Sequence, residues 1–142
     1  YMGGYIKNPS YHEVCSGKTG HTETIKITYD KNIISYSKLL EIFFFTHDPT
    51  KLNRQGNDVG TQYRSAVFFE NQSEKKQIFE SISIFEKKKI YNEPFVTEII
   101  NKIEFYEAET EHHDYYNQNK SQSYCQFVIR PKIKKFENLL NK

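Results

Sequence analysis

One polar stretch, residues 11–23, gathers several side chains that could do chemistry. It contains Cys15, His21 and Glu23 together with a tyrosine, a second histidine and two glycines. A thiolate that is activated by a histidine, with an acid to orient that histidine, is the machinery of cysteine hydrolases. However, His21 and Glu23 are two residues apart, so on a strand they would point in parallel, which is a poor geometry for a proton relay. We therefore do not expect a hydrolase.

A second stretch, residues 53–65, is rich in Asn, Gln, Arg and Asp and contains two glycines. Because glycine permits positive φ, this loop can fold tightly and bring Asp58 and Tyr63 together. It runs directly into the apolar residues 66–69, and a polar loop beside a strand usually presents side chains to a ligand. The alternative is a surface loop with ordinary turn chemistry.

A third cluster lies near residue 110 and offers potential metal ligands: Glu109, Glu111, His112, His113 and Asp114. Its spacing matches no strong ligand motif, and adjacent histidines on a helix point about 100° apart. We expect the helix to pack His112 inward and to leave the acids in water, so no metal site is predicted.

The element that must position Glu23 is a predicted strand at residues 22–29. Ile25, Ile27 and Tyr29 alternate with polar residues and share one face. This register places Glu23 on the apolar face, where desolvation disfavours the ionised carboxyl. The alternative is a glutamate at the end of a strand that reaches water.

The remaining patterns predict a small α+β protein with helices on a mixed or antiparallel sheet. Residues 1–21 are expected to be an ordered loop, because Gly, Pro, Asn and Ser interrupt every periodicity. Ser35 is a predicted helix cap, and Asn71 with Glu74 has the spacing of a capping box. The predicted helices are 35–45, 72–88, 108–117 and 131–140, and the further predicted strands are 64–70, 95–100 and 103–106.

Length and composition narrow the class of protein. The 142 residues are enough for one domain, residues 1–142, with a real core, and no apolar run approaches the 18 residues of a membrane span. A net charge of +2 gives no argument for nucleic acid, and two cysteines favour a reducing compartment, which we take to be the cytoplasm. The chain begins with Tyr1 and not Met, so we expect it to be part of a longer or processed gene product.

Taken together, the motifs resemble the peptide methionine sulfoxide reductase family, the A type that reduces the S epimer. The resemblance covers nearly the whole chain, and its long central run is very specific. It rests on Gly3-Gly4-Tyr5, Asn8-Pro9-Ser10-Tyr11, Glu13-Val14-Cys15-Ser16-Gly17, Thr19-Gly20-His21-Thr22-Glu23, His47-Asp48-Pro49-Thr50, the run from Arg54 to Ser65, Phe105-Tyr106, Ala108-Glu109, His112 and Tyr124-Cys125. It implies a two-layer α/β plait, a ferredoxin-like sandwich, with long coil segments.

The resemblance also implies roles for individual residues. Glu23 matches the general acid of the family, and Tyr11 and Tyr63 match the two tyrosines that bind the sulfoxide oxygen. Asp58 matches a loop carboxylate that helps to organise the site. Cys125 matches the position of a resolving cysteine, although the residues after it are not glycine-rich, so a buried structural thiol is the equal alternative.

The sequence departs from the family at the nucleophile. In the family this cysteine lies in a Gly-Cys-Phe-Trp-Gly motif upstream of the matched segment, whereas this chain has no Trp, and Cys15 matches a cysteine that is not the nucleophile. We therefore expect an amino-terminally truncated piece that lacks the first strand and helix and is inactive alone. The alternative is a non-catalytic domain that binds sulfoxides.

For the complete protein, the resemblance implies reduction of methionine S-sulfoxide, in oxidised proteins or free, as a repair reaction under oxidative stress. The chemistry passes through a cysteine sulfenic acid and uses thioredoxin, or dithiothreitol in vitro, as the external reductant. No metal, flavin or other cofactor is implied, and we expect a monomer.

Overall fold

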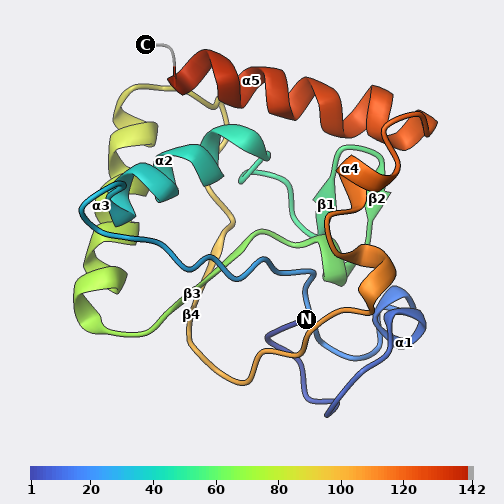
Figure 1. Ribbon diagram of the computed structural model, residues 1–142. Helices are drawn as coiled ribbons and strands as arrows, with labels where there is room; N and C mark the ends of the chain where they lie inside the picture. The colour runs from blue at the N-terminus through green and yellow to red at the C-terminus, as the bar shows by residue number, and fades with distance from the viewer. Residues whose placement is uncertain (141–142) are drawn as a thin grey trace.

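The computed structural model describes residues 1–140 and confirms an α+β protein (Figure 1). Helices, short strands and long coil segments alternate along the chain. The helices are α1 (Tyr11–Cys15), α2 (Tyr36–Thr46), α3 (Gln72–Lys87), α4 (Tyr115–Gln118) and α5 (Arg130–Leu140), with 3-10 turns η1 (Thr61–Tyr63) and η2 (Thr110–His112) and a π-helix η3 (Cys125–Ile129). The strands are β1 (Arg54–Gln55), β2 (Asp58–Val59), β3 (Ala66–Phe69) and β4 (Glu98–Asn101).

The hydrophobic core lies where α2 and α3 pack together over β3 and β4. Its buried members are Leu40, Phe44, Phe69, Ile78 and Phe85. The ring of Phe44 is central: its centroid lies 5.7 Å from that of Phe85 and 5.2 Å from that of Phe95. Aromatic pairs at such separations add attraction to the burial of apolar surface. This cluster explains why the phenylalanine-rich sequence of α2 folds as a buried helix.

Both long helices begin where their capping residues predict. The Ser35 side chain accepts a hydrogen bond from the amide of Lys38, and Asn71 Oδ1 accepts one from Glu74 at 2.9 Å. The predicted capping box at α3 is only half formed, because the Glu74 carboxylate accepts its bond from the amide of Glu70 and not from that of Asn71. Each cap therefore satisfies one of the amino-terminal amide donors of its helix.

The sheet structure is smaller than the sequence predicts. Strands β3 and β4 pair in parallel, with Ala66 opposite Glu98 and Phe69 opposite Asn101. Strands β1 and β2 form a separate antiparallel hairpin that turns at Gly56. Within residues 1–140 each sheet contains two strands.

Two predicted strands are wrong. Residues 22–29 run extended but find no neighbouring strand to pair with in the described part of the chain, apart from one isolated bridge between Met2 and Thr22. As a result Ile25 and Ile27, expected on a half-buried face, are 75% and 52% exposed. The predicted strand 103–106 is likewise coil, and its Tyr106 amide donates to Tyr1. Alternation alone does not make a strand without a hydrogen-bonding partner.

Two other predicted segments differ locally. The helix predicted at 108–117 is divided into η2 and α4, because Asp114 adopts a left-handed conformation with φ of 48° between them. The predicted loop 1–21 contains the short helix α1, which begins with a complete capping box between Ser10 and Glu13.

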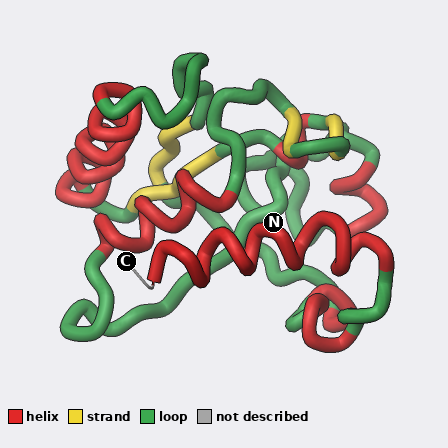
Figure 2. Tube along the Cα trace, turned by 90° about the horizontal axis from the view of Figure 1, so that it is seen from above, coloured by secondary structure: helices red, strands yellow, loops and turns green. Residues whose placement is uncertain are grey.

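The carboxyl-terminal helix is confirmed. α5 lies alongside α2, as the two views in Figures 1 and 2 agree. It continues from the π-helix η3, which begins with the buried Cys125. None of the helices within residues 1–140 is long and apolar enough to cross a bilayer.

Candidate active site

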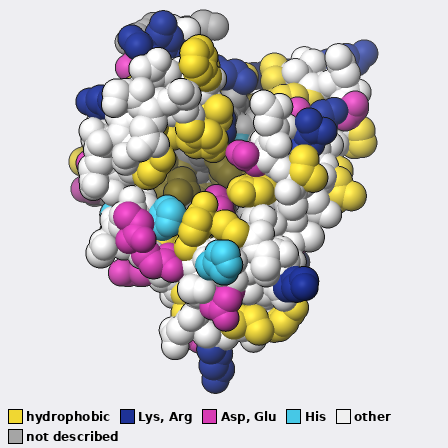
Figure 3. Space-filling view, turned by 90° about the vertical axis from the view of Figure 1, so that its right-hand side faces the viewer, with side chains coloured by type: hydrophobic (Ala, Val, Ile, Leu, Met, Phe, Trp, Pro, Cys, Tyr) yellow, Lys and Arg dark blue, Asp and Glu magenta, His cyan; other side chains and the backbone are white. Residues whose placement is uncertain are grey.

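Segments far apart in the sequence meet around one cavity of about 820 Å³ on the side of the molecule away from α3. The wall comes from α1 and the coil after it, from the β1–β2 hairpin and η1, and from residues 105–124. Figure 3 shows the hollow with histidine and acidic side chains at its rim. The lining includes Tyr11, Glu23, Asp58 and Tyr63, so four of the five predicted site residues are brought together.

Glu23 reaches the cavity from the coil that follows the Met2–Thr22 bridge. Its backbone amide donates to the carbonyl oxygen of Gln62 at 2.9 Å, which fixes the start of this coil against η1. Solvent reaches the side chain through the mouth of the cavity, yet crowding by protein atoms desolvates the carboxyl and raises its pKa, with a further increase from the charge of Asp58. A carboxyl with a raised pKa keeps its proton to higher pH, which is what a general acid requires.

Tyr11 is the first residue of α1 and is held by residues from the carboxyl-terminal part of the chain. Its amide donates to Glu109 Oε1 at 2.6 Å, and its ring lies against that of His112 with the centroids 4.3 Å apart. Hydrogen bonding with the Cys15 thiol, followed by burial, raises the pKa of the Tyr11 hydroxyl. A phenol that keeps its proton can donate a hydrogen bond into the cavity.

Tyr63 closes η1 and faces the same space. Desolvation raises the pKa of its hydroxyl, and the charges of Glu23, Cys15 and Asp58 add to the increase. Asp58 lies on β2, where one carboxylate oxygen accepts a hydrogen bond from the Tyr124 hydroxyl at 3.2 Å. Burial beside Asp58 raises the pKa of Tyr124 to about 12. The cavity is therefore lined by protonated tyrosine hydroxyls around one carboxyl, that of Glu23, whose pKa is raised.

The two cysteines lie outside this lining. Both are free thiols, and Cys125 is fully buried at the start of η3. Cys15 is partly exposed and is not among the residues that line the cavity, although its thiol lies near enough to the Tyr11 hydroxyl to raise the pKa of that hydroxyl. Cys125 is therefore not among the residues that line the cavity, although its neighbour Tyr124 is.

Two further clusters that the sequence singled out, around His21 and near residue 110, have the following contacts. His21 is 1% exposed; its Nδ1 accepts from the Gly4 amide at 3.2 Å and its Nε2 donates to the Ile6 carbonyl oxygen at 2.7 Å. Both ring nitrogens are therefore used to hold the loop, and neither is available to activate Cys15. Near residue 110, His113 Nε2 lies 2.9 Å from the Ala108 carbonyl oxygen, and residues 1–140 contain no group of three or more potential metal ligands.

Several lining residues were quoted in the sequence motifs without a role. Phe105, His112 and Tyr124 all border the cavity, and Tyr1 and Tyr115 add two more aromatic rings. The Glu109 carboxylate accepts a hydrogen bond from the amide of Tyr11 and another from the Tyr1 hydroxyl at 2.9 Å, which join the amino-terminal segment to the segment around residue 109. No local pattern marks such contacts.

Comparison with known proteins relates the whole chain to one family. The family model "Peptide methionine sulfoxide reductase" matches residues 1–142. The chain is 51% identical over 139 residues to peptide methionine sulfoxide reductase MsrA of Saccharolobus solfataricus, covering 98% of this chain and 77% of that protein. It is 50% identical over 136 residues to MsrA of Sulfolobus acidocaldarius, covering 96% and 76%.

Solved structures agree with the sequences. Reduced Mxr1 of Saccharomyces cerevisiae superposes with a TM-score of 0.76 at 34% identity, covering 82% of this chain and 63% of that one. Methionine sulfoxide reductase A of Corynebacterium diphtheriae superposes with a TM-score of 0.72 at 32% identity, covering 85% and 62%. The chain therefore spans less than two thirds of either solved protein. It belongs to the peptide methionine sulfoxide reductase family of oxidoreductases, in its A type, MsrA.

Proposed function

We propose that the site serves the reduction of methionine S-sulfoxide, free or in proteins, when a cysteine nucleophile is supplied to it. The observation that carries this proposal is the cavity itself, where a carboxyl with a raised pKa faces protonated tyrosine hydroxyls. A sulfoxide has a polarised S–O bond, so phenol donors can bind its oxygen while the acid delivers a proton to it. Tyr11 and Tyr63 are assigned to the oxygen, Glu23 to the proton, and Asp58 to the organisation of the wall through Tyr124.

The redox balance requires a thiol at the sulfur. Its thiolate attacks the sulfoxide sulfur and forms an S–S bond, while the oxygen takes up the proton from Glu23. The S–O and S–S bonds then both break as the hydroxyl passes to the attacking sulfur, which leaves the thioether of methionine and a sulfenic acid. The sulfoxide sulfur gains two electrons and the thiol sulfur loses two. A second thiol then displaces water from the sulfenic acid and forms a disulfide, which an external dithiol reduces.

We propose that the chain alone is inactive, because neither of its cysteines matches the nucleophile of the family. Cys15 does not border the cavity, and Cys125 is fully buried. Burial also argues against Cys125 as the resolving thiol in this conformation and favours its structural alternative. We assign recycling to an external dithiol, thioredoxin or dithiothreitol. A monomeric state and a cytoplasmic location stay predictions.

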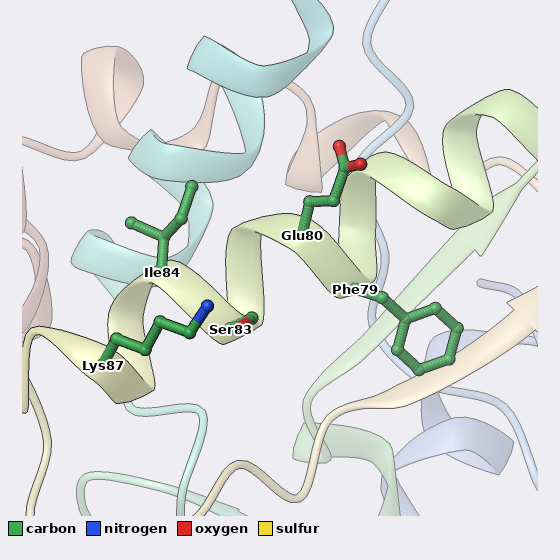
Figure 4. A pocket seen from close by; sticks show the side chains of 5 residues that line it. All are labelled: Phe79, Glu80, Ser83, Ile84 and Lys87. Carbon is green, nitrogen blue, oxygen red and sulfur yellow. The ribbon is translucent and has the colours of Figure 1, made fainter.

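The ferredoxin-like plait is proposed for the chain when it is completed by a strand and helix with Gly-Cys-Phe-Trp-Gly. Residues 23–30 are extended and carry exposed isoleucines beside the cavity, which is the surface that an added strand would cover. A shallow depression on α3 also exposes apolar side chains. Figure 4 shows Phe79 and Ile84 there, and both are about half exposed. All its labelled side chains, which include the polar Glu80, Ser83 and Lys87, come from this one helix, and we assign it no role in the proposed reaction.

Turnover of a methionine S-sulfoxide peptide with dithiothreitol tests the proposal. The present chain is compared with the same chain preceded by a segment that carries Gly-Cys-Phe-Trp-Gly. Activity only in the extended chain is the expected result, with none after replacement of the motif's cysteine by serine. Turnover by the present chain would contradict the assignment, because Cys15 or Cys125 would then be the nucleophile. Sulfoxide binding without turnover in the extended chain would support a binding domain instead.

A further inference from the structure

Gln62 lies at the meeting point of the three segments that carry Tyr11, Glu23 and Tyr63. Its carbonyl oxygen accepts hydrogen bonds from the Glu23 amide at 2.9 Å and from the Thr22 hydroxyl at 3.0 Å. Its side-chain Nε2 donates to the Cys15 carbonyl oxygen at 3.2 Å, at the end of α1. Tyr63 is the next residue along the chain. One residue thus contacts each of the three segments that carry Tyr11, Glu23 and Tyr63.

Stability does not account for this side chain. Gln62 is 5% exposed, and its Oε1 is buried without a hydrogen-bond donor anywhere in residues 1–140. An unpaired buried acceptor destabilises the folded state, so such an atom requires another explanation. The amide is also tightly enclosed, because a Cβ at Gly60, whose φ is +154°, would lie 2.3 Å from Oε1. The backbone of Gly60 therefore packs directly against this amide.

We propose that Gln62 is the positioning residue that sets the placement of Glu23 relative to Tyr11 and Tyr63. Its main chain fixes Glu23 and its amide fixes the end of α1, so a shift of either contact changes the distance between the acid and the phenols. The proposal rests on the proposed function for its catalytic consequence, but the placement concerns this chain alone. As a supporting observation, hydrogen bonding from the Gln62 side chain lowers the pKa of Tyr63, in opposition to the burial and charges that raise it.

The test is Gln62→Met, which keeps the length and bulk of the side chain but removes its polar atoms. The expected structural result is a melting temperature close to that of the parent, because the lost hydrogen bond to Cys15 is offset by the lost unpaired acceptor. The expected positioning result is a raised Tyr63 pKa, measured from the ζ-carbon resonance of labelled tyrosine, with Tyr63→Phe to identify the signal. Gln72→Met, on the exposed first turn of α3, is the matched control and leaves the Tyr63 titration unchanged.

In the chain extended with Gly-Cys-Phe-Trp-Gly, kcat of Gln62→Met should fall on the order of 10- to 100-fold with a smaller change in KM, since small misplacements of reacting groups cost rate. A folded Gln62→Met with the parent's Tyr63 titration, or with the parent's kcat, overturns the proposal. If Gln62→Met does not fold, Gly60→Ala, which presses on the same amide, takes its place under the same criteria. If the parent extended chain shows no turnover, the proposed function fails, while the tyrosine titration still decides the positioning.

Discussion

The two halves of the molecule are held together by different interactions. Around α2, α3, β3 and β4, aromatic and aliphatic side chains pack on one another with Phe44 at the centre. Around the cavity, coil segments are joined by hydrogen bonds such as those from Gln62 and Arg64, whose guanidinium donates to Gly20 and Thr61. The apolar half supplies stability through buried area, whereas the cavity half supplies geometry through a few directional contacts. Substitutions in the first should therefore change stability, and those in the second should change chemistry.

The largest expected effect is chemical. Glu23→Gln in the extended, nucleophile-bearing chain should lower kcat by roughly 100- to 10,000-fold, because the amide cannot deliver a proton. Stability should change little, since the side chain is open to solvent. Desolvation raises the pKa of Glu23, so the parent's rate should fall as pH rises through that pKa. This fall should be absent from the pH–rate profile of the variant. Sulfoxide turnover against pH measures both.

Glu80→Gln on the exposed face of α3 is the matched control, and we expect it to keep the parent's kcat and pH profile. A Glu23→Gln variant with undiminished turnover would remove Glu23 from the mechanism and leave the tyrosines as the only proton donors.

In the apolar half the largest expected effect is on stability. Phe44→Ala deletes a fully buried ring with several aromatic neighbours, which should lower the free energy of unfolding by about 3–5 kcal/mol. Phe127→Ala, at a ring that is 77% exposed, should change it by less than about 0.5 kcal/mol. Urea unfolding of both variants measures the difference. Similar losses in the two would mean that Phe44 does not anchor the core.

The same division explains what the sequence could predict. α2, α3 and α5 follow from their apolar residues and from caps at Ser35 and Asn71, and the apolar run of β3 is a local signal as well. α1 was missed although Ser10 and Glu13 carry a capping-box signal, because the surrounding glycines and prolines suggest coil. The extended run 22–29 was misread as a strand because pairing depends on a neighbour that periodicity does not reveal.

The cavity was foreseen only through the family resemblance. Its walls are joined by contacts between residues far apart in sequence, with separations of 98 residues for Tyr11 and Glu109 and of 66 for Tyr124 and Asp58. Such contacts leave no local pattern. Glu23 illustrates the difference, because it borders the cavity as expected, but on a coil tied to Gln62 and not through the register of a strand.

His47 connects the end of α2 to the start of β3 and gives a pH-dependent test of the apolar half. Its Nδ1 donates to the Phe43 carbonyl oxygen at the end of α2, and its Nε2 accepts from the Ser65 hydroxyl before β3. Burial lowers the pKa of His47 to about 4. Because the unfolded chain takes up the proton near the ordinary pKa of about 6.5, stability should fall between pH 6.5 and 4, by on the order of 3 kcal/mol in total.

Urea unfolding from pH 7.5 to pH 4 measures this loss, and His47→Gln should flatten the profile over that range. His113→Gln is the control, since His113 lies on the exposed rim of the cavity. A profile that His47→Gln leaves unchanged would assign the acid sensitivity to other groups.

The smallest effects should still distinguish the halves. Ser10→Ala and Asn71→Ala each remove a side chain that accepts from a helix amino terminus, which costs about 1 kcal/mol. Asn71 caps the sixteen-residue α3, whose packing is part of the core, so its loss should lower the global free energy of unfolding. Ser10 caps the five-residue α1, which is held by polar contacts at the cavity wall, so its loss should appear as faster amide exchange in residues 11–15 at nearly unchanged global stability. Equal losses of global stability would show that the cavity half unfolds together with the core. The two halves would then differ in the kind of contact that holds them, although they unfold as one cooperative unit.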